Sequence, residues 1–137
     1  MADSRNVVMV DTAAFYALAS QNDAYHDAAR QAYVLILSEE RELWTTSYAL
    51  VETMALIQRR LGFDALTDFM NRIGGSVNIH WIDDEDHNQA WDRLVEQRGA
   101  GLSLVDWTVA LASEMMDATI FTFDRGFANQ GFSIMPA

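Results

Sequence analysis

LSLVDWTVALASEMMDATIFTFDRGFANQGF, residues 102–132, is the stretch that decides the fold. Ser103 suits the start of a helix, and Asp106 falls in the first turn of that helix. Residues 118–123 form a short run that favours β-structure, and the run stops at Asp124. The stretch therefore predicts a helix, a strand and a short helix, with an aspartate at two of the joins. If the strand belongs to a parallel sheet, both carboxylates can approach one edge of that sheet.

The rest of the chain repeats this alternation of strands and helices. Val7 to Val10 is a continuous, mostly β-branched apolar run that ends at Asp11, which is typical of a strand buried on both faces of a parallel sheet. This order predicts an α/β domain with a mainly parallel sheet and helices on both faces. The other expected strands are residues 43–45, 77–82 and 132–135, and the other expected helices are residues 12–19, 24–42, 46–60, 63–73, 83–98 and 126–130.

Composition limits what the chain can do. Its 137 residues carry a formal net charge of −11, and all nine basic residues are arginine. We expect one domain spanning residues 1–137. The absence of cysteine excludes disulfides and thiolate metal sites, and the absence of lysine excludes a P-loop lysine or a Schiff base. Strong acidity argues against broad nucleic-acid binding, but it is compatible with a nucleic-acid enzyme whose acidic site is neutralised by metal ions.

Nothing in the sequence predicts export or insertion into a membrane. The segment Met1 to Val10 has one arginine and about four consecutive apolar residues, too few for a signal peptide. No later run approaches the roughly 18 apolar residues of a membrane span. We therefore expect a soluble cytoplasmic protein.

Three aspartates have positions that suit either a structural role or a shared site. Asp11 and Asp124 each follow an expected strand and could cap the helix that comes next. Asp106 stands three residues after Ser103, so this pair resembles a capping box with aspartate in place of glutamate. Because sites in parallel sheets form beyond the carboxyl ends of the strands, the same positions could also bring the aspartates together.

Glu52 is harder to explain as a structural residue. Its helical neighbours three and four positions away are all apolar or aromatic, so we expect it on a buried face. A buried glutamate must be paired, protonated or bound to a cation. Arg59 and Arg60 lie two turns further on, so a long-range arginine is the structural alternative. The neighbours are Tyr48, Ala49, Ala55 and Leu56.

Convergence of these acids would create a metal site. Clustered carboxylates repel one another, which raises their pKa values unless a divalent cation lies among them. Oxygen ligands without cysteine favour Mg²⁺ or Mn²⁺ over zinc. Such an ion can activate water for attack on a phosphodiester. The four acids that would hold such an ion are Asp11, Glu52, Asp106 and Asp124.

Together these segments resemble the PIN domain, especially the VapC-type toxins of bacteria and archaea. The resemblance is carried by VVMVDTAAFYAL (residues 7–18), the helix with Glu52, LSLVDWTVALA (residues 102–112) and TFDRGF (residues 122–127). It implies a three-layer α/β/α fold and a metal-dependent endoribonuclease whose catalytic residues are Asp11, Glu52, Asp106 and Asp124. It also implies that Asp11 and Asp106 are the principal metal ligands, while Glu52 and Asp124 complete the coordination or hold a second ion.

The resemblance further implies an RNA substrate, a homodimer and a small antitoxin protein that restrains the toxin. Thr12 and Thr122 fall where the family places small hydroxyls beside the acids, and Ser103 begins the third motif, so these three are predicted to contact the substrate. Arg125 follows the last acid and could contact phosphate, or it could form a surface ion pair. The chain departs from the family expectation in having few basic residues to hold RNA.

Two other functions fit parts of the pattern. A non-catalytic PIN-like module, binding protein or RNA, would use the same acids as caps and ion pairs. A phosphatase of the haloacid-dehalogenase kind would need a DxD motif, and the sequence Asp11-Thr-Ala lacks the second aspartate.

Overall fold

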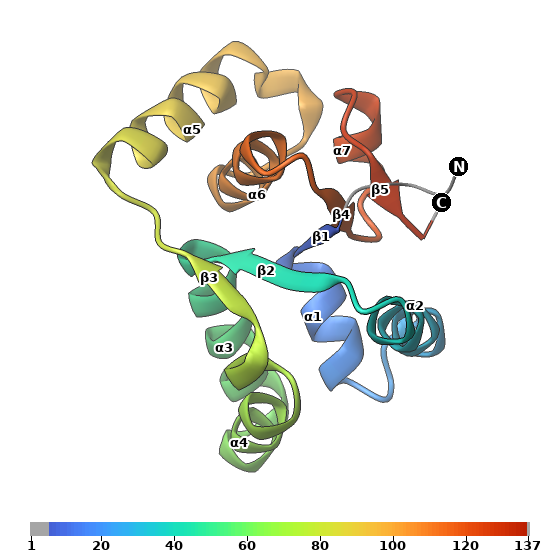
Figure 1. Ribbon diagram of the computed structural model, residues 1–137. Coiled ribbons are helices and arrows are strands. Elements are labelled where there is room, and N and C mark those ends of the chain that lie inside the picture. Colours follow the sequence, from blue (N-terminus) through green and yellow to red (C-terminus); the bar gives the residue numbers. More distant parts are fainter. Residues whose placement is uncertain (1–5, 137) are drawn as a thin grey trace.

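The central element of the protein is a parallel sheet of five strands, seen in a computed structural model that describes residues 6–136 (Figure 1). The strand order is β3-β2-β1-β4-β5, and every neighbouring pair is parallel. This arrangement confirms the expected sheet. The strands are β1 (Val7–Val10), β2 (Glu42–Thr46), β3 (Asn78–His80), β4 (Thr119–Phe121) and β5 (Ile134–Met135).

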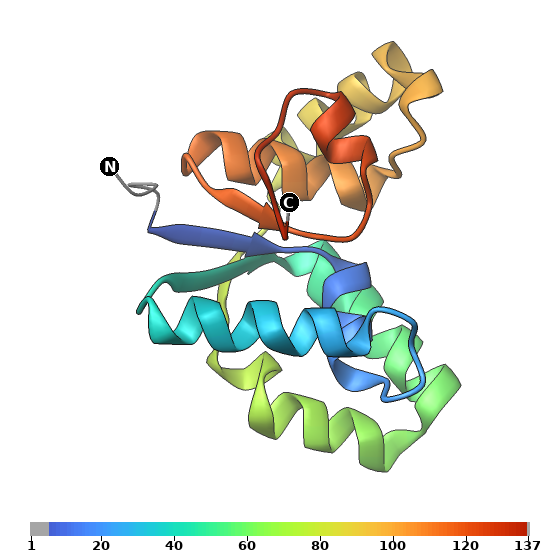
Figure 2. The same cartoon turned by 90° about the vertical axis from the view of Figure 1, so that its right-hand side faces the viewer.

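Helices cover both faces of the sheet and complete the three layers that the family resemblance implied. They are α1 (Thr12–Ala19), α2 (His26–Ser38), α3 (Ser47–Leu61), α4 (Phe63–Arg72), α5 (Asp84–Glu96), α6 (Leu104–Met115) and α7 (Gly126–Asn129), with 3₁₀ turns at Gly74–Ser76 and Arg98–Ala100. Helices α1 to α4 lie below the sheet in Figures 1 and 2, and α5, α6 and α7 lie above it.

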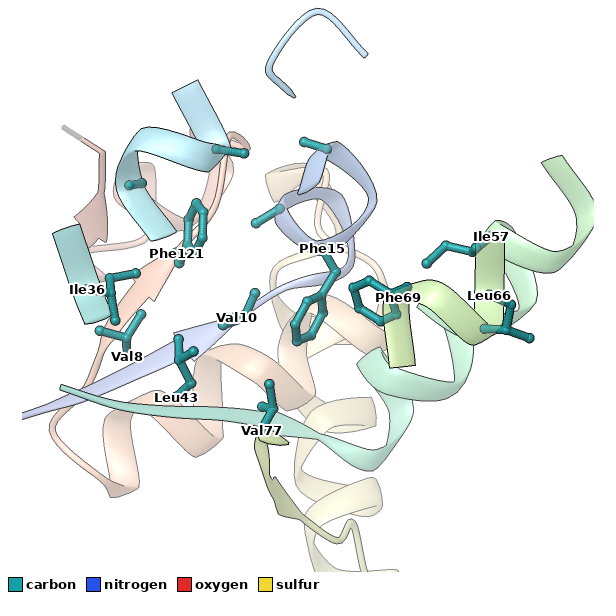
Figure 3. Close-up of a cluster of buried hydrophobic side chains, with 14 residues drawn as sticks. Val8, Val10, Phe15, Ile36, Leu43, Ile57, Leu66, Phe69, Val77 and Phe121 are labelled. Atoms are coloured by element: carbon teal, nitrogen blue, oxygen red, sulfur yellow. The ribbon is translucent and has the colours of Figure 1, made fainter. Parts of the chain in front are cut away.

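Side chains of alternate residues in the central strands pack into two separate apolar cores. Val8 and Val10 of β1 point into the core shared with α1, α2 and α4 (Figure 3). Met9 belongs to the other core, which is shared with α6. In the first core, the rings of Phe15 and Phe69 meet edge to face at 5.5 Å. A strand buried on both faces needs apolar side chains at every position, which explains the uninterrupted run in β1.

The topology creates a crevice at the carboxyl ends of β1 and β4. From β1 the chain moves outward to β2 and β3, and it then returns to the other side of β1 as β4. Crossovers that run in opposite directions from two adjacent strands leave an opening between them, where ligands bind in open α/β sheets. The backbone amide of Asp11 donates to the carbonyl of Phe121 at 3.3 Å, which holds the two strand ends together.

Several helices and strands are shorter than the sequence predicted. The expected helix 24–42 ends at Ser38, and β2 already begins at Glu42. Glu40 has a positive φ of 55°, so the chain leaves the helical conformation there without a glycine to signal the turn. The expected strands 77–82, 118–123 and 132–135 are shorter in the structure because only two or three residues of each pair with a neighbouring strand.

The structure adds one observation about membranes. Within residues 6–136, none of the helices has both the length and the apolar character needed to cross a bilayer. Residues 1–5, which belong to the N-terminal segment considered as a signal peptide, lie outside the described residues.

Candidate active site

A pocket of about 530 Å³ opens at the crevice between β1 and β4. All four predicted acids line it, although they come from four different parts of the fold: the end of β1, the middle of α3, the first turn of α6 and the loop after β4. The fold thus brings together side chains that are more than 100 residues apart in the sequence. The four acids are Asp11, Glu52, Asp106 and Asp124.

Asp11 is the most buried of these acids, with 2% of its surface exposed. One carboxylate oxygen accepts a hydrogen bond from the backbone amide of Ala14 at 2.8 Å and so caps α1. The other oxygen accepts from the hydroxyl of Thr122. Burial raises the pKa of the Asp11 carboxyl to about 7, and the nearby charges of Asp106 and Asp124 act in the same direction.

Asp106 forms the capping box that the sequence suggested. Its backbone amide donates to the hydroxyl of Ser103 at 3.0 Å, and the amide of Ser103 donates back to Asp106 Oδ2 at 2.9 Å. Burial raises the pKa of the Asp106 carboxyl, and the charges of Asp124 and Glu52 add to the rise. The structural role and the site role therefore coexist, because capping occupies Oδ2 while the side chain still lines the pocket.

Asp124 is fixed by a tight turn. Its amide donates to the hydroxyl of Thr122 at 2.9 Å, and its Oδ1 accepts from the amide of Gly126 at 2.8 Å. A side chain at position 126 would crowd this carboxylate, since an added Cβ would lie 2.9 Å from Asp124 Oδ1 and 3.0 Å from Leu102 Cδ2. Thr122 thus contacts both Asp11 and Asp124 and orients two of the acids at once.

The expectation for Glu52 was wrong in one respect. Its side chain is exposed, not buried, because the face of α3 that carries it opens onto the pocket instead of packing against a layer. The argument that burial demands a partner therefore fails. Glu52 nevertheless lines the same pocket as the three aspartates, and within residues 6–136 no arginine forms an ion pair with it.

The carboxylate oxygens that line the pocket are chemically suitable ligands for a hard divalent ion. Carboxylate oxygens are the ligands that Mg²⁺ and Mn²⁺ prefer, and the raised pKa of Asp11 indicates a buried carboxylate that the surrounding protein does not neutralise. In the described part of the chain, however, no three acidic or histidine side chains are already arranged closely enough to enclose an ion. The acids surround an open pocket and do not form the crowded cluster that the sequence suggested.

Comparison with known proteins identifies the family. The model of the PIN domain matches residues 8–133, almost the whole chain. This chain belongs to the PIN domain family. No curated protein sequence matches it significantly.

Solved structures show the same fold. The Mycobacterium tuberculosis toxin VapC20, described as cleaving the sarcin–ricin loop, is 26% identical, with a TM-score of 0.79 over 91% of this chain and 95% of that one. VapBC2 of Rickettsia felis, bound to a promoter DNA fragment, is 14% identical, with a TM-score of 0.70 over 93% and 96%. VapBC-1 of nontypeable Haemophilus influenzae is also 14% identical, with a TM-score of 0.64 over 94% and 96%.

The remaining predicted residues of this PIN domain differ in their relation to the pocket. Thr12 and Ser103 line it, and the hydroxyl of Thr12 donates to the carbonyl of Ala49 at 3.4 Å. Thr122 is buried behind the acids that it orients. Arg125 is exposed and is not among the lining residues.

Sequence reasoning overlooked part of the pocket wall. Arg60 lines it, and its spacing of eight residues from Glu52, with Leu56 between them, was a signal that all three share one face of α3. Its guanidinium carbon lies 5.4 Å from the centre of the Tyr16 ring. For the aromatic lining residues, no comparable spacing in the sequence indicated that they would reach the pocket. The other overlooked lining residues are Ala13, Tyr16, Asp23, Tyr25 and Phe123.

Proposed function

We propose that this PIN domain is a metal-dependent endoribonuclease and the toxin of a VapBC-type toxin–antitoxin pair. The observation that carries the proposal is the pocket itself, in which four acids from distant parts of the chain converge at the sheet edge where α/β folds bind ligands. Membership of the PIN family and the likeness to VapC20, at 26% identity, support the same conclusion. The proposed cofactor is Mg²⁺ or Mn²⁺.

The ligands would be Asp11 and Asp106, with Glu52 and Asp124 completing the coordination or binding a second ion. When bound, such an ion supplies a Lewis acid for the phosphate oxygens and lowers the pKa of a water molecule. The chain itself supplies rigid positioning, because Thr122 orients Asp11 and helix capping orients Asp106. Pre-oriented ligands reduce the reorganisation that the reaction requires.

The remaining contacts with RNA would be made at the pocket wall. Thr12 and Ser103 present small hydroxyls at the wall and are proposed to contact the substrate. Arg60 is better placed than Arg125 to meet a phosphate in the pocket, although Arg125 is retained as a contact for RNA that extends beyond it.

The assembly and location of the protein are also proposals. We expect residues 1–137 to work as one domain, in the cytoplasm, as a homodimer restrained by an antitoxin. Two neighbours, from Rickettsia felis and Haemophilus influenzae, are VapBC structures, which supports a partner of this kind. Light scattering of the purified protein, alone and co-expressed with the product of an adjacent gene, measures both associations.

The test of the enzyme proposal compares two aspartate substitutions. Wild type, Asp11→Asn and Asp92→Asn are each incubated with labelled RNA, both a sarcin–ricin loop hairpin and a single strand, in Mg²⁺, Mn²⁺ or EDTA. Asp92 is exposed on α5 and does not line the pocket, so its removal controls for the loss of one negative charge. We expect cleavage that requires metal and falls by at least about 100-fold in Asp11→Asn alone.

Two results would contradict the proposal. Equal cleavage by wild type and Asp11→Asn would show that a contaminating nuclease is responsible. No cleavage together with no Mn²⁺ binding in calorimetry would instead favour the non-catalytic PIN-like module.

A further inference from the structure

A pair of stacked aromatic rings lines the acidic pocket. The rings of Tyr25 and Phe123 lie 4.6 Å apart between centroids and only 14° from parallel. Both residues line the pocket that holds the four acids. Because Phe123 covers one face of the Tyr25 ring and 52% of Tyr25 is exposed, the open surface of Tyr25 lies on the opposite face and the rim.

The pair is held rigidly although Tyr25 lies in a loop. The carboxylate of Asp23 accepts a hydrogen bond from the backbone amide of Tyr25 at 2.8 Å, and the carbonyl of Asp23 accepts from the amide of His26 at 3.0 Å. On the other side, Phe123 packs edge to face on the buried Phe121 at 6.0 Å. The exposed ring is thus pre-oriented, and binding to it would cost little conformational entropy.

The charge of the pocket makes an uncharged contact valuable. Four carboxylates repel a phosphodiester, and among the described residues that line the pocket Arg60 is the only basic one. The whole chain carries a net charge of −11, so counterion release can contribute little to RNA affinity. Stacking of a base on an aromatic ring is not opposed by this negative field, and it is the usual means by which proteins hold unpaired bases.

From these observations we infer that Tyr25, backed by Phe123, is a stacking platform for one unpaired nucleobase of the RNA substrate. The base lies on the open face of Tyr25, while its backbone passes the acids in the same pocket. Tyr25 is therefore a substrate-binding residue whose contribution depends on the aromatic ring and not on its hydroxyl. This inference rests on the proposed ribonuclease function, since it names a contact for the same substrate.

The test is a double-mutant cycle between the ring and the bases. Fluorescein-labelled octa-adenylate and an octamer of abasic ribose phosphates are titrated with protein in EDTA, and binding is followed by anisotropy. The proteins are wild type, Tyr25→Ala, Tyr25→Phe and Phe123→Leu. Trp91→Ala is the matched control, because Trp91 is 54% exposed on α5 and lies outside the pocket.

We expect Tyr25→Ala to weaken binding of octa-adenylate by roughly 5- to 100-fold. The same substitution should leave the abasic octamer unaffected, so the two changes are not additive. Tyr25→Phe and Trp91→Ala should bind like wild type, and Phe123→Leu should show an intermediate loss because the backing ring is gone. Thermal melts of each variant establish that the fold is retained.

Different results would overturn the stacking platform and the nuclease function. Equal weakening for both octamers, or no binding of octa-adenylate by wild type, would overturn the platform even if the protein cleaves RNA. Conversely, base-dependent binding through Tyr25 in a protein that cleaves no RNA with any metal would overturn the nuclease function and leave the platform standing.

Discussion

At the scale of single residues, the site is built from aspartates that each perform two tasks. Asp11 caps α1 through one oxygen and accepts from Thr122 through the other, yet it also lines the pocket. Burial of its charge is unfavourable for the protein without metal, and this burial raises the pKa of the Asp11 carboxyl. Function and stability should therefore oppose each other at this position.

Asp11→Asn should stabilise the metal-free protein at high pH. The pKa of Asp11 rises from 3.8 to about 7 on folding, so between these values the native state binds more protons than the unfolded state. The contribution of Asp11 to stability is therefore largest below pH 3.8 and is lost as the pH rises toward 7. The free energy of unfolding lost in this way is at most about 4 kcal/mol, because a pKa difference of one corresponds to about 1.4 kcal/mol. Asparagine still caps a helix and carries no charge.

Melting curves in EDTA across the pH range measure this effect. The advantage of Asp11→Asn over wild type should grow from about pH 4 to pH 8 and shrink again when Mg²⁺ is added, because only wild type retains the full set of proposed ligands. A pH-independent difference between the two proteins would mean that Asp11 is not buried as an unneutralised acid.

At the scale of secondary-structure elements, two helices offer a matched comparison. Both α5 and α6 begin with a capping box: Asp83 with Asp86 in α5, and Ser103 with Asp106 in α6. Only the second lies at the pocket. We expect Ser103→Ala and Asp83→Ala each to cost about 1 kcal/mol of unfolding free energy. Only Ser103→Ala should also lower kcat, because the lost hydroxyl accepts from the backbone amide of Asp106 and so helps to position the residue that lines the pocket.

Denaturant titrations and cleavage kinetics of the two variants separate these effects. A similar fall in activity for both would show that capping acts on catalysis only through global stability. A rise in KM alone in Ser103→Ala would indicate that its hydroxyl contacts RNA and does not position Asp106.

The same elements explain what the sequence could predict. Strand ends, helix caps and the capping box are local features, so the sequence alone was enough to place Asp11, Asp106 and Asp124 at the sheet edge. Burial of the α3 face could not be predicted, because helical periodicity does not say which apolar face another layer covers. Val51 on α3 is 64% exposed, and Glu52 is exposed beside it. The stacking of Tyr25 on Phe123 joins positions far apart in the chain and had no local signal.

At the scale of the whole molecule, the charge distribution predicts that RNA affinity depends on salt concentration in an unusual way. Most proteins that bind RNA lose affinity steeply as salt increases, because their basic side chains release counterions from the phosphates. Here a chain with a net charge of −11 presents one arginine, Arg60, among the described residues that line the pocket. Salt also screens the repulsion between the acids and RNA, which partly cancels the loss.

We therefore expect RNA affinity to depend only weakly on salt, and we expect Arg60 to account for most of that dependence. For octa-adenylate in EDTA, log K against log salt should have a slope of about −0.7 or shallower, the value for one phosphate contact on a single strand. Arg60→Gln should weaken binding and flatten the slope, whereas Arg59→Gln, which removes a neighbouring exposed arginine outside the pocket, should change neither. A steep slope that survives Arg60→Gln would place the main RNA contacts on another surface, such as the exposed Arg125. Both the charge argument and the importance of the aromatic platform would then have to be abandoned.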